Sequence, residues 1–361
     1  MSLYVGIDGA ARRAARLFVG VNGLARKVRR AYIGVNNVAR RFYASDPALF
    51  CGTGAQMSAS HFNHGLARAG DFVLCAGGTS AAQNVDAFNE AGVQTYVEAL
   101  PESVGYIAGV TASDGTAVFA GGIADNVRVA RVYRYNKDLV RGELSPLQSP
   151  RGGAGAARVG KWALIGGGVD NAGKQDDVDA YDAETFARTT AHWMNALMDA
   201  PIGTGNRAYA FFGGGYIDSA SQASASVTAY NVSLSCMSPS GLSAARYLCA
   251  GATAGDHALF AGGNTGSAAS GVVDAYDDAL VHSAVSLPSA CGAPAGGALD
   301  GLGVVLHTEN RSTCFFDAAL VRKTGQSFAS SVSVSRTRTG VACGARLWFA
   351  RGTTTLYTYF S

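Results

Sequence analysis

Charge is scarce in this sequence, and long apolar runs and closely paired cysteines are missing. Only 15% of its 361 residues are charged, against roughly 25% in an average globular chain, which argues against a disordered or strongly nucleic-acid-steered protein. The 8 prolines do not accompany a glycine at every third position, which excludes collagen. No stretch reaches the ~18 consecutive apolar residues of a spanning helix, and the first residues lack the apolar core of a signal peptide.

The seven cysteines include no CxxC pair and are odd in number. Metal-ligand spacing is therefore absent, and a complete disulfide framework is impossible. Cys75 and Cys249 lie in apolar runs, where a free thiol behaves as a small core residue. These features favour folding in a reducing cytosol.

Glycine, in contrast, is abundant, with 47 residues. Each glycine inside a helix costs about 1 kcal/mol relative to alanine, so a helical fold is disfavoured. The composition predicts a protein rich in tight turns.

Positive charge is concentrated at the start of the chain. Residues 1–45 carry nine basic side chains and one acid, Asp8, whereas the other 316 residues carry 20 basic and 25 acidic groups. A basic arm commonly contacts nucleic acid, an anionic surface or an acidic partner. Arginines that simply solvate the outward face of strands are the alternative. The positions expected to act in anchoring or assembly are Arg12, Arg13, Arg26, Lys27, Arg29, Arg30, Arg40 and Arg41.

A 14-residue repeat fills this basic segment. Its units begin at Val5, Val19 and Ile33 and read VGIDGAAR, VGVNGLAR and IGVNNVAR. Asp-Gly, Asn-Gly and Asn-Asn between short β-prone stretches predict three tight hairpins, because these residues tolerate the positive φ of a type I′ turn. Such hairpins are too small to bury a core alone, so we expect them to dock on a neighbour or on copies of themselves.

The repeat resembles the VGVNGVARKVKK-type repeats at the N-termini of tail and other structural proteins encoded by bacterial prophages. The resemblance covers about 45 residues. It implies a virion-associated protein whose first segment attaches it to a larger assembly. Independent convergence on short Asn-Gly hairpins is the alternative.

A second, longer repeat runs from residue 72 onward, and the domain that it predicts spans residues 46–361. An apolar run ending in paired glycine recurs five times, at Gly77-Gly78, Gly121-Gly122, Gly166-Gly167, Gly213-Gly214 and Gly262-Gly263, with two degenerate copies near His307 and Gly352. Each copy is followed by a β-branched or similar residue, an aromatic residue and, in six copies, Asn or Asp, as in Val178 to Asp182. Steps of 44 to 49 residues between strand-like units indicate a β-propeller of about four strands per blade.

This pattern resembles the kelch repeat, an apolar strand ending in Gly-Gly followed by a strand ending in Tyr-Asp. An arginine that often begins the family's first strand is matched by Arg151, Arg246 and Arg336, which lie 15, 16 and 15 residues before the glycine pair. The family's downstream tryptophan is largely missing. We therefore expect an all-β fold, a seven-bladed kelch-like β-propeller preceded by the hairpin segment. The last copy lacks a fourth strand, and we expect residues 46–56 to supply it.

Loops of variable length on a rigid scaffold are where recognition usually resides. The connections from second to third strands vary most in the middle copies, and Trp193 could act as a stacking platform. The ligand-binding residues that this predicts are Asn126, Asp170, Asn171, Lys174, Trp193, Tyr216, Asp218 and Asn264. Solvated turn residues are the alternative for each of them.

No catalytic motif stands out. Among six histidines only His61 and His64 are close in sequence, and the carboxylates show no glycosidase pattern. We therefore expect no catalytic residue, no cofactor and no metal.

Taken together, these patterns predict a non-enzymatic bacteriophage or prophage virion protein, folded in the bacterial cytoplasm and present in several copies. Its partners would be other virion proteins through residues 1–45 and a host-surface glycan or protein through the loops, without direct nucleic-acid contact or membrane insertion. A soluble kelch-type adapter and a carbohydrate-active enzyme are the alternatives.

Overall fold

The computed structural model describes residues 4–7, 10–13, 17–21, 24–28, 30–35, 38–44, 50–59, 61–79, 83–217, 222–310, 312–327, 339–344, 346–350 and 355–360. The chain divides into two compact units, Met1–Leu49 and Phe50–Ser361. The sequence placed this division four residues earlier, between 45 and 46. The described part of the chain holds no helix long and apolar enough to cross a membrane.

The first unit contains three separate two-stranded antiparallel sheets, which are the hairpins that the 14-residue repeat predicts. Their strands are β1 (Tyr4–Ile7) and β2 (Ala10–Arg13), β3 (Leu17–Val21) and β4 (Leu24–Val28), and β5 (Arg30–Val35) and β6 (Val38–Ala44). Seven of the eight predicted anchoring residues lie on these strands, and Arg29 lies outside the described residues.

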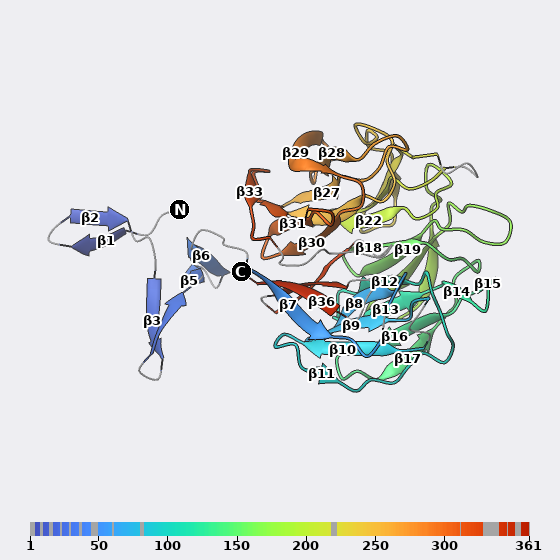
Figure 1. The fold of residues 1–361 in the computed structure, drawn as a ribbon, viewed down its shortest axis with the longest axis horizontal. Helices are drawn as coiled ribbons and strands as arrows, with labels where there is room; N and C mark the ends of the chain where they lie inside the picture. The colour runs from blue at the N-terminus through green and yellow to red at the C-terminus, as the bar shows by residue number, and fades with distance from the viewer. Residues whose placement is uncertain are drawn as a thin grey trace. The chain divides into compact units, whose positions relative to one another are not determined.

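The second unit contains seven four-stranded antiparallel sheets within the described residues (Figure 1). The first sheet comprises β8 (Gly65–Ala69), β9 (Phe72–Ala76), β10 (Val85–Asn89) and β11 (Gln94–Thr95). The second comprises β12 (Ala108–Thr111), β13 (Ala117–Ala120), β16 (Val132–Tyr135) and β17 (Arg141–Leu144), with the small hairpin β14 (Ile123–Ala124) and β15 (Val127–Arg128) between β13 and β16. The third comprises β18 (Gly155–Val159), β19 (Trp162–Gly166), β20 (Val178–Asp182) and β21 (Arg188–Ala191).

The remaining sheets repeat this order. The fourth comprises β22 (Ile202–Gly205), β23 (Ala210–Gly213), β24 (Val227–Tyr230) and β25 (Cys236–Met237). The fifth comprises β26 (Ala250–Ala254), β27 (His257–Ala261), β28 (Ser270–Tyr276) and β29 (His282–Cys291). The sixth comprises β30 (Ala295–Leu299), β31 (Leu302–Leu306), β32 (Thr313–Phe316) and β33 (Arg322–Thr324). The seventh comprises β34 (Val341–Cys343), β35 (Arg346–Ala350), β36 (Thr355–Phe360) and β7 (Phe50–Gln56).

The two repeated sequence elements are the central strands of every sheet. The apolar run before the glycine pair forms the second strand, and the segment ending in the aromatic residue forms the third. Both central strands are buried in the first six sheets, as in β13 and β24. The secondary structure predicted from the repeat is therefore confirmed.

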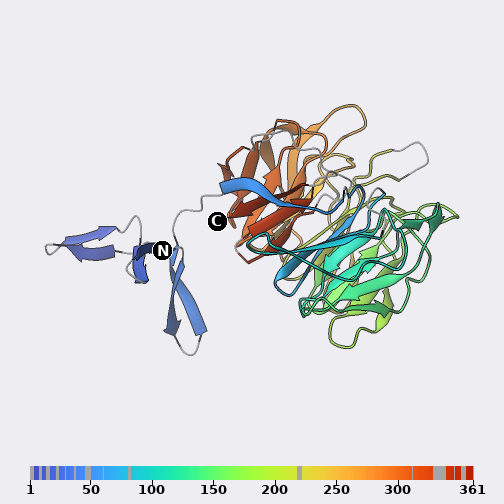
Figure 2. The same cartoon turned by 60° about the horizontal axis from the view of Figure 1, so that its bottom comes forward.

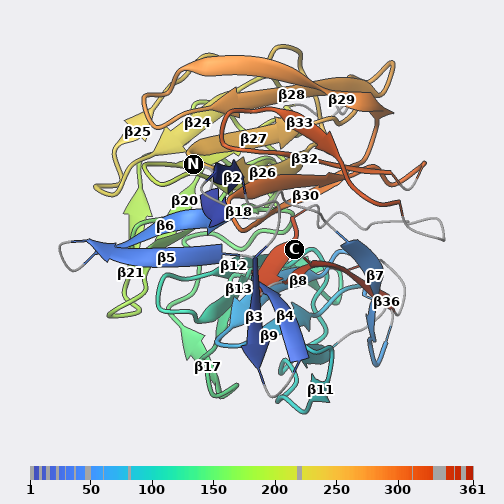
Figure 3. The ribbon, with the colours of Figure 1, turned by 90° about the vertical axis from the view of Figure 1, so that its left-hand side faces the viewer.

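The seventh sheet joins the two ends of this unit. β7 pairs antiparallel with β36, so a strand from before the first sheet becomes the outer strand of the last. Figures 2 and 3 show β7 beside the C-terminal strand. The pairing expected for residues 46–56 is present from Phe50 onward.

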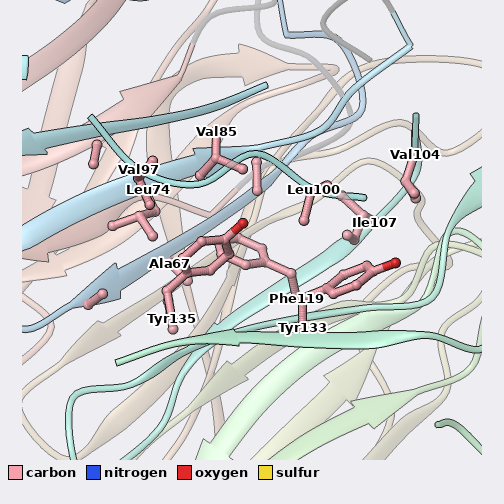
Figure 4. Close-up of a cluster of buried hydrophobic side chains, with 14 of the residues drawn as sticks. Ala67, Leu74, Val85, Val97, Leu100, Val104, Ile107, Phe119, Tyr133 and Tyr135 are labelled. Carbon is pink, nitrogen blue, oxygen red and sulfur yellow. The ribbon is translucent and has the colours of Figure 1, made fainter. Parts of the chain in front are cut away.

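Apolar side chains fill the space between neighbouring sheets. Figure 4 shows the cluster in which Leu74 of the first sheet meets Phe119, Tyr133 and Tyr135 of the second. The Phe119 and Tyr135 rings meet edge to face with centroids 6.0 Å apart, a favoured aromatic geometry. The core is thus divided among clusters that tie each sheet to its neighbour.

The paired glycines follow the second strand and turn the chain out of the sheet. Gly77 and Gly78 have φ of 67° and 113°, and a Cβ at Gly77 would lie 2.4 Å from the Val104 carbonyl oxygen. In the third and fourth sheets the pair with positive φ is one residue later than the repeat predicts. Gly166 and Gly213 still belong to the strands β19 and β23 there.

Candidate functional site

Three sheets bury a cation against an aspartate. Arg151 and Asp179 in the third sheet are fully buried, with Nη2 2.6 Å from Oδ2. Arg246 forms the same pair with Asp274 in the fifth sheet. In the first sheet the cation is His61, whose Nε2 lies 2.9 Å from Asp86 Oδ2.

These cations occupy one register in the repeat. His61, Arg151 and Arg246 each lie 16 residues before the first glycine with positive φ in the pair that follows. In the second and fourth sheets that register holds Gly105 and Met198, and the aspartate position holds Tyr133 and Thr228. In the first five sheets cation and aspartate therefore occur together or not at all, because a buried charge without its partner is strongly unfavourable.

His61 is held as an imidazolium. Its Nδ1 donates to the Gly77 carbonyl oxygen at 2.5 Å and its Nε2 donates to Asp86, so both ring nitrogens face acceptors and both carry protons. Burial alone would lower the pKa of His61. The negative charge of Cys75 and the hydrogen bond to Asp86 act the other way and raise that pKa from 6.5 to about 10.

Cys75 lies on β9, fully buried beside two imidazole rings. Burial alone would raise the pKa of its thiol. The charges of His64 and His61 and hydrogen bonds with both rings outweigh burial and lower the pKa from 9.0 to about 6. Burial raises the pKa of Cys314, by contrast, to about 12. The sequence placed Cys75 in the core correctly, but it gave no sign of a thiolate there.

His64 links this cluster to a cavity. Its Nδ1 donates to the His61 carbonyl oxygen at 2.8 Å, and its ring also forms a hydrogen bond with Cys75. The two rings are nearly perpendicular, with centroids 6.2 Å apart. The sequence noted only that these two histidines are close along the chain.

The cavity, here called the inner-strand cavity, lies where the chain enters the inner strands of the first four sheets. Its volume is about 90 Å³, and its lining includes His64, Tyr106, Ala154, Pro201, Ile202 and Thr339. That is room for about three water molecules or one small functional group. His61, Cys75 and Asp86 do not line it. Only His64 of this cluster can therefore touch a molecule in the cavity, and the other three lie behind it.

The predicted loop residues fall into two groups. Lys174 Nζ lies 6.0 Å from the centre of the Tyr216 ring, which stacks on Tyr247 at 4.4 Å. Asn264 forms a β-bridge with Tyr247, so three predicted residues are brought together. Sequence reasoning missed Tyr247, which precedes the inner strand β26.

The second group lies on the neighbouring connections. Asn126, with φ of 62°, is in the turn of the β14–β15 hairpin, and Arg128 of that hairpin donates to Asn171 Oδ1 at 3.2 Å. Asp170 accepts hydrogen bonds from the backbone of its own loop. Trp193, 59% exposed, lies on the connection after β21. Asp218 lies outside the described residues.

Within the described ranges, no three His, Cys, Asp or Glu side chains are grouped so that they could hold a metal ion. The His61, His64, Cys75 and Asp86 cluster is a group of interacting ionisable side chains.

No protein-family model and no curated protein matches this sequence. Solved structures do share its fold. A catalytically inactive histidine-to-alanine variant of virginiamycin B lyase from Staphylococcus aureus, solved with quinupristin, has 11% identity, a TM-score of 0.64 and coverage of 87% of this chain and 99% of its own. A streptogramin B lyase has 12% identity, a TM-score of 0.60 and coverage of 86% and 97%.

A third similar structure is YjhT, with 13% identity, a TM-score of 0.58 and coverage of 76% of this chain and 99% of its own. Identities this low establish the fold alone, which is β-propeller-like. The kelch subtype expected from the sequence stays a prediction.

These neighbours correct the functional interpretation of the sequence. The prediction of a non-enzymatic virion protein, with loops for host attachment, is contradicted by propeller-like structures that cover most of this chain and are named as lyases. The expectation that the chain is not an enzyme is contradicted by the same finding. That interpretation rested on a resemblance over residues 1–45, whereas the lyase structures cover 87% and 86% of the chain.

Proposed function

We propose that the second unit is a closed seven-bladed propeller that acts as an enzyme, with His64 as the general base of an elimination reaction. The observation that carries this proposal is the position of His64. It lines the inner-strand cavity and is backed by a buried imidazolium and a cysteine with a lowered pKa.

Contacts among the inner strands support the closed ring. β8 contacts β12, β12 contacts β18, and the series continues through β22, β26 and β30 to β34, which contacts β8 again. The pairing of β7 with β36 supports closure from the outer edge. In such a ring the inner-strand cavity would open on the central axis.

The chemistry proposed for His64 follows from its hydrogen bonds. With Nδ1 committed to the His61 carbonyl, the His64 ring would exchange its hydrogen bond with Cys75 for the substrate, and Nε2 would take a proton from a substrate carbon. The electron pair of the broken C–H bond would form a C=C bond, and the leaving group would depart with the pair that had joined it to the neighbouring carbon. The Cys75 thiolate behind His64 would stabilise the imidazolium formed in this step.

Two properties of the similar structures support a lyase reaction. A lyase cleaves a bond by elimination and adds no water, and two of the similar structures carry that name. A single histidine-to-alanine change made one of them catalytically inactive. Cys75 is a weaker candidate for direct attack on substrate, because it is fully buried and does not line the cavity.

The test uses quinupristin as the probe and the full chain as the enzyme. Liquid chromatography with mass spectrometry should detect a product formed without addition of water, and His64→Ala should lower its formation about 10²- to 10⁴-fold, the usual contribution of a general base. His192→Ala alters an exposed histidine and should leave turnover unchanged. A product heavier by one water would contradict elimination, and absence of both binding and turnover would contradict this substrate class.

A further inference from the structure

A second and larger cavity is lined by residues of the first sheet. Asp86 lines it, whereas Cys75 does not. It has a volume of about 450 Å³, and its lining includes Ser58, Asn84, Asp86, Gln94, Tyr96 and Val97. Cavities of roughly 300 to 1,000 Å³ are the size that small ligands occupy. We call this the first-sheet cavity.

The repeat shows what fills the same place in other sheets. Gln94, Arg188 and His282 occupy one register, since each pairs with the aromatic residue of the third strand, Phe88, Tyr181 and Tyr276. Each also contacts the buried aspartate of its sheet. Arg188 Nη1 lies 2.7 Å from Asp179 Oδ1, and His282 Nε2 lies 2.7 Å from Asp274 Oδ1.

The first sheet has a neutral residue in this register. Gln94 Nε2 donates to Asp86 Oδ1 at 2.5 Å, which replaces the contact but not the charge. Asp179 therefore faces two arginines, whereas Asp86 faces one cation, His61. Asp86 Oδ2 accepts from both His61 and the Ser58 backbone, which leaves accepting capacity on Oδ1.

The rim of the cavity adds an aromatic side chain. Tyr96 is 89% exposed, an unusual position for so large an apolar ring. The residues in its register are Thr190 and Ala284, which are smaller and carry no ring. An exposed tyrosine face beside a carboxylate is a recurring way to hold an organic cation.

We propose that the first-sheet cavity binds a small molecule bearing a protonated amine. The ammonium group donates to Asp86 Oδ1 beside the Gln94 amide, which already donates to that oxygen, and it lies against the face of the Tyr96 ring. It supplies the positive charge that Arg188 and His282 supply in their sheets. This binding is independent of the proposed catalytic role of His64.

Isothermal titration calorimetry of the full chain with putrescine tests the proposal, with 1,4-butanediol as the neutral probe of matching length. The diamine should bind and the diol should not. Gln94→Arg supplies the missing cation as in the third sheet, and it should lower putrescine affinity at least 10-fold without lowering the thermal midpoint. Tyr96→Ala should weaken binding by roughly 2- to 5-fold, the size of an exposed cation–π contact.

Thr190→Ala provides the matched control, because it alters the same register in the third sheet and should leave putrescine affinity unchanged. Equal binding of diamine and diol would overturn the proposal, as would undiminished binding to Gln94→Arg. If Gln94→Arg fails to fold, the diol comparison and Tyr96→Ala still test the proposal. Diol binding together with unchanged putrescine affinity in Tyr96→Ala would overturn the proposal.

Discussion

At the level of single residues, the buried cations and aspartates vary together across the first five sheets. His61, Arg151 and Arg246 share one register with respect to the glycine turn, and each faces an aspartate. The sequence pattern identified the two arginines but not the histidine, which is a different residue type. In the third sheet the spacing was also counted to Gly166, one residue before the first glycine with positive φ. The contact of His61 with Cys75 depends on the pairing of β8, β9 and β10, which no local motif records.

The first prediction concerns the pH dependence of stability. His61 has a raised pKa of about 10, so its contribution is full below 6.5 and is lost as pH rises through about 10. Cys75 has a lowered pKa of about 6, so its contribution is full above 9.0 and is lost as pH falls through about 6. The two slopes oppose each other between these values, and the free energy of unfolding should be nearly flat from about pH 6.5 to 9.

Cys75→Ala removes one of the two opposing slopes. Urea unfolding across this range should then show stability falling steadily as pH rises. Cys314→Ala, which removes a buried thiol whose pKa is raised to about 12, should keep the flat profile. Parallel profiles for wild type and Cys75→Ala would show that the thiol is not coupled to His61.

The second prediction separates buried from exposed ion pairs. Arg151→Met leaves Asp179 buried with Arg188 as its remaining cation, and it should cost about 3 to 5 kcal/mol of unfolding free energy. Arg207 pairs with Asp278 at 2.7 Å but is 76% exposed. Arg207→Met should cost less than about 1 kcal/mol. Denaturant unfolding of both variants measures the difference, and equal costs would contradict the burial argument.

At the level of strands and sheets, tyrosines of the third strands tie each sheet to the preceding connection. Tyr135, Tyr181, Tyr230 and Tyr276 each donate from the hydroxyl to a backbone carbonyl 36 to 38 residues earlier, at 2.7 to 3.0 Å. The sequence predicted the aromatic position from its recurrence. It also predicted the glycine turn. Runs of three glycines at 166–168 and 213–215 leave open which two of them form the turn. The strand pairing of β19 and β23 shows that the first glycine of each run belongs to the strand.

The third prediction removes one of these ties. Tyr230→Phe deletes the hydrogen bond to the His192 carbonyl, which is 2.7 Å long. The partly buried hydrogen bond is lost, so the free energy of unfolding should fall by about 1 kcal/mol. Tyr96→Phe, on an exposed ring, should change it by less than about 0.5 kcal/mol. Chemical denaturation of the two variants makes the comparison, and an unaffected Tyr230→Phe would count against the tie.

At the level of the whole molecule, the sequence predicted the architecture of the second unit but not its function. The all-β architecture with seven four-stranded sheets follows from the spacing of glycine and aromatic residues. The function did not, because His61, His64, Cys75 and Asp86 come together only after three strands pair. The functional interpretation therefore depended on a short, distinctive repeat at the start of the chain and not on the larger unit. That interpretation was non-enzymatic, and the lyase neighbours contradict it.

The fourth prediction concerns the strand that joins both ends of the second unit. Removing residues 1–44 leaves β7 intact, and the propeller-like unit should keep its unfolding midpoint. Removing residues 1–56 also removes β7 and exposes the edge of β36. That shorter chain should unfold at a lower temperature and exchange the amides of β36 faster in hydrogen-exchange measurements. Identical midpoints for the two truncations would contradict the role assigned to β7.

The proposed enzyme activity depends on His64, the residue that connects the buried cluster to the inner-strand cavity. The measurement that tests it most directly is kcat/KM for quinupristin in wild type, His64→Ala and His192→Ala, made side by side. We expect His64→Ala to lose at least about 100-fold while His192→Ala stays within about 2-fold of wild type. Equal kcat/KM values for wild type and His64→Ala would contradict the account.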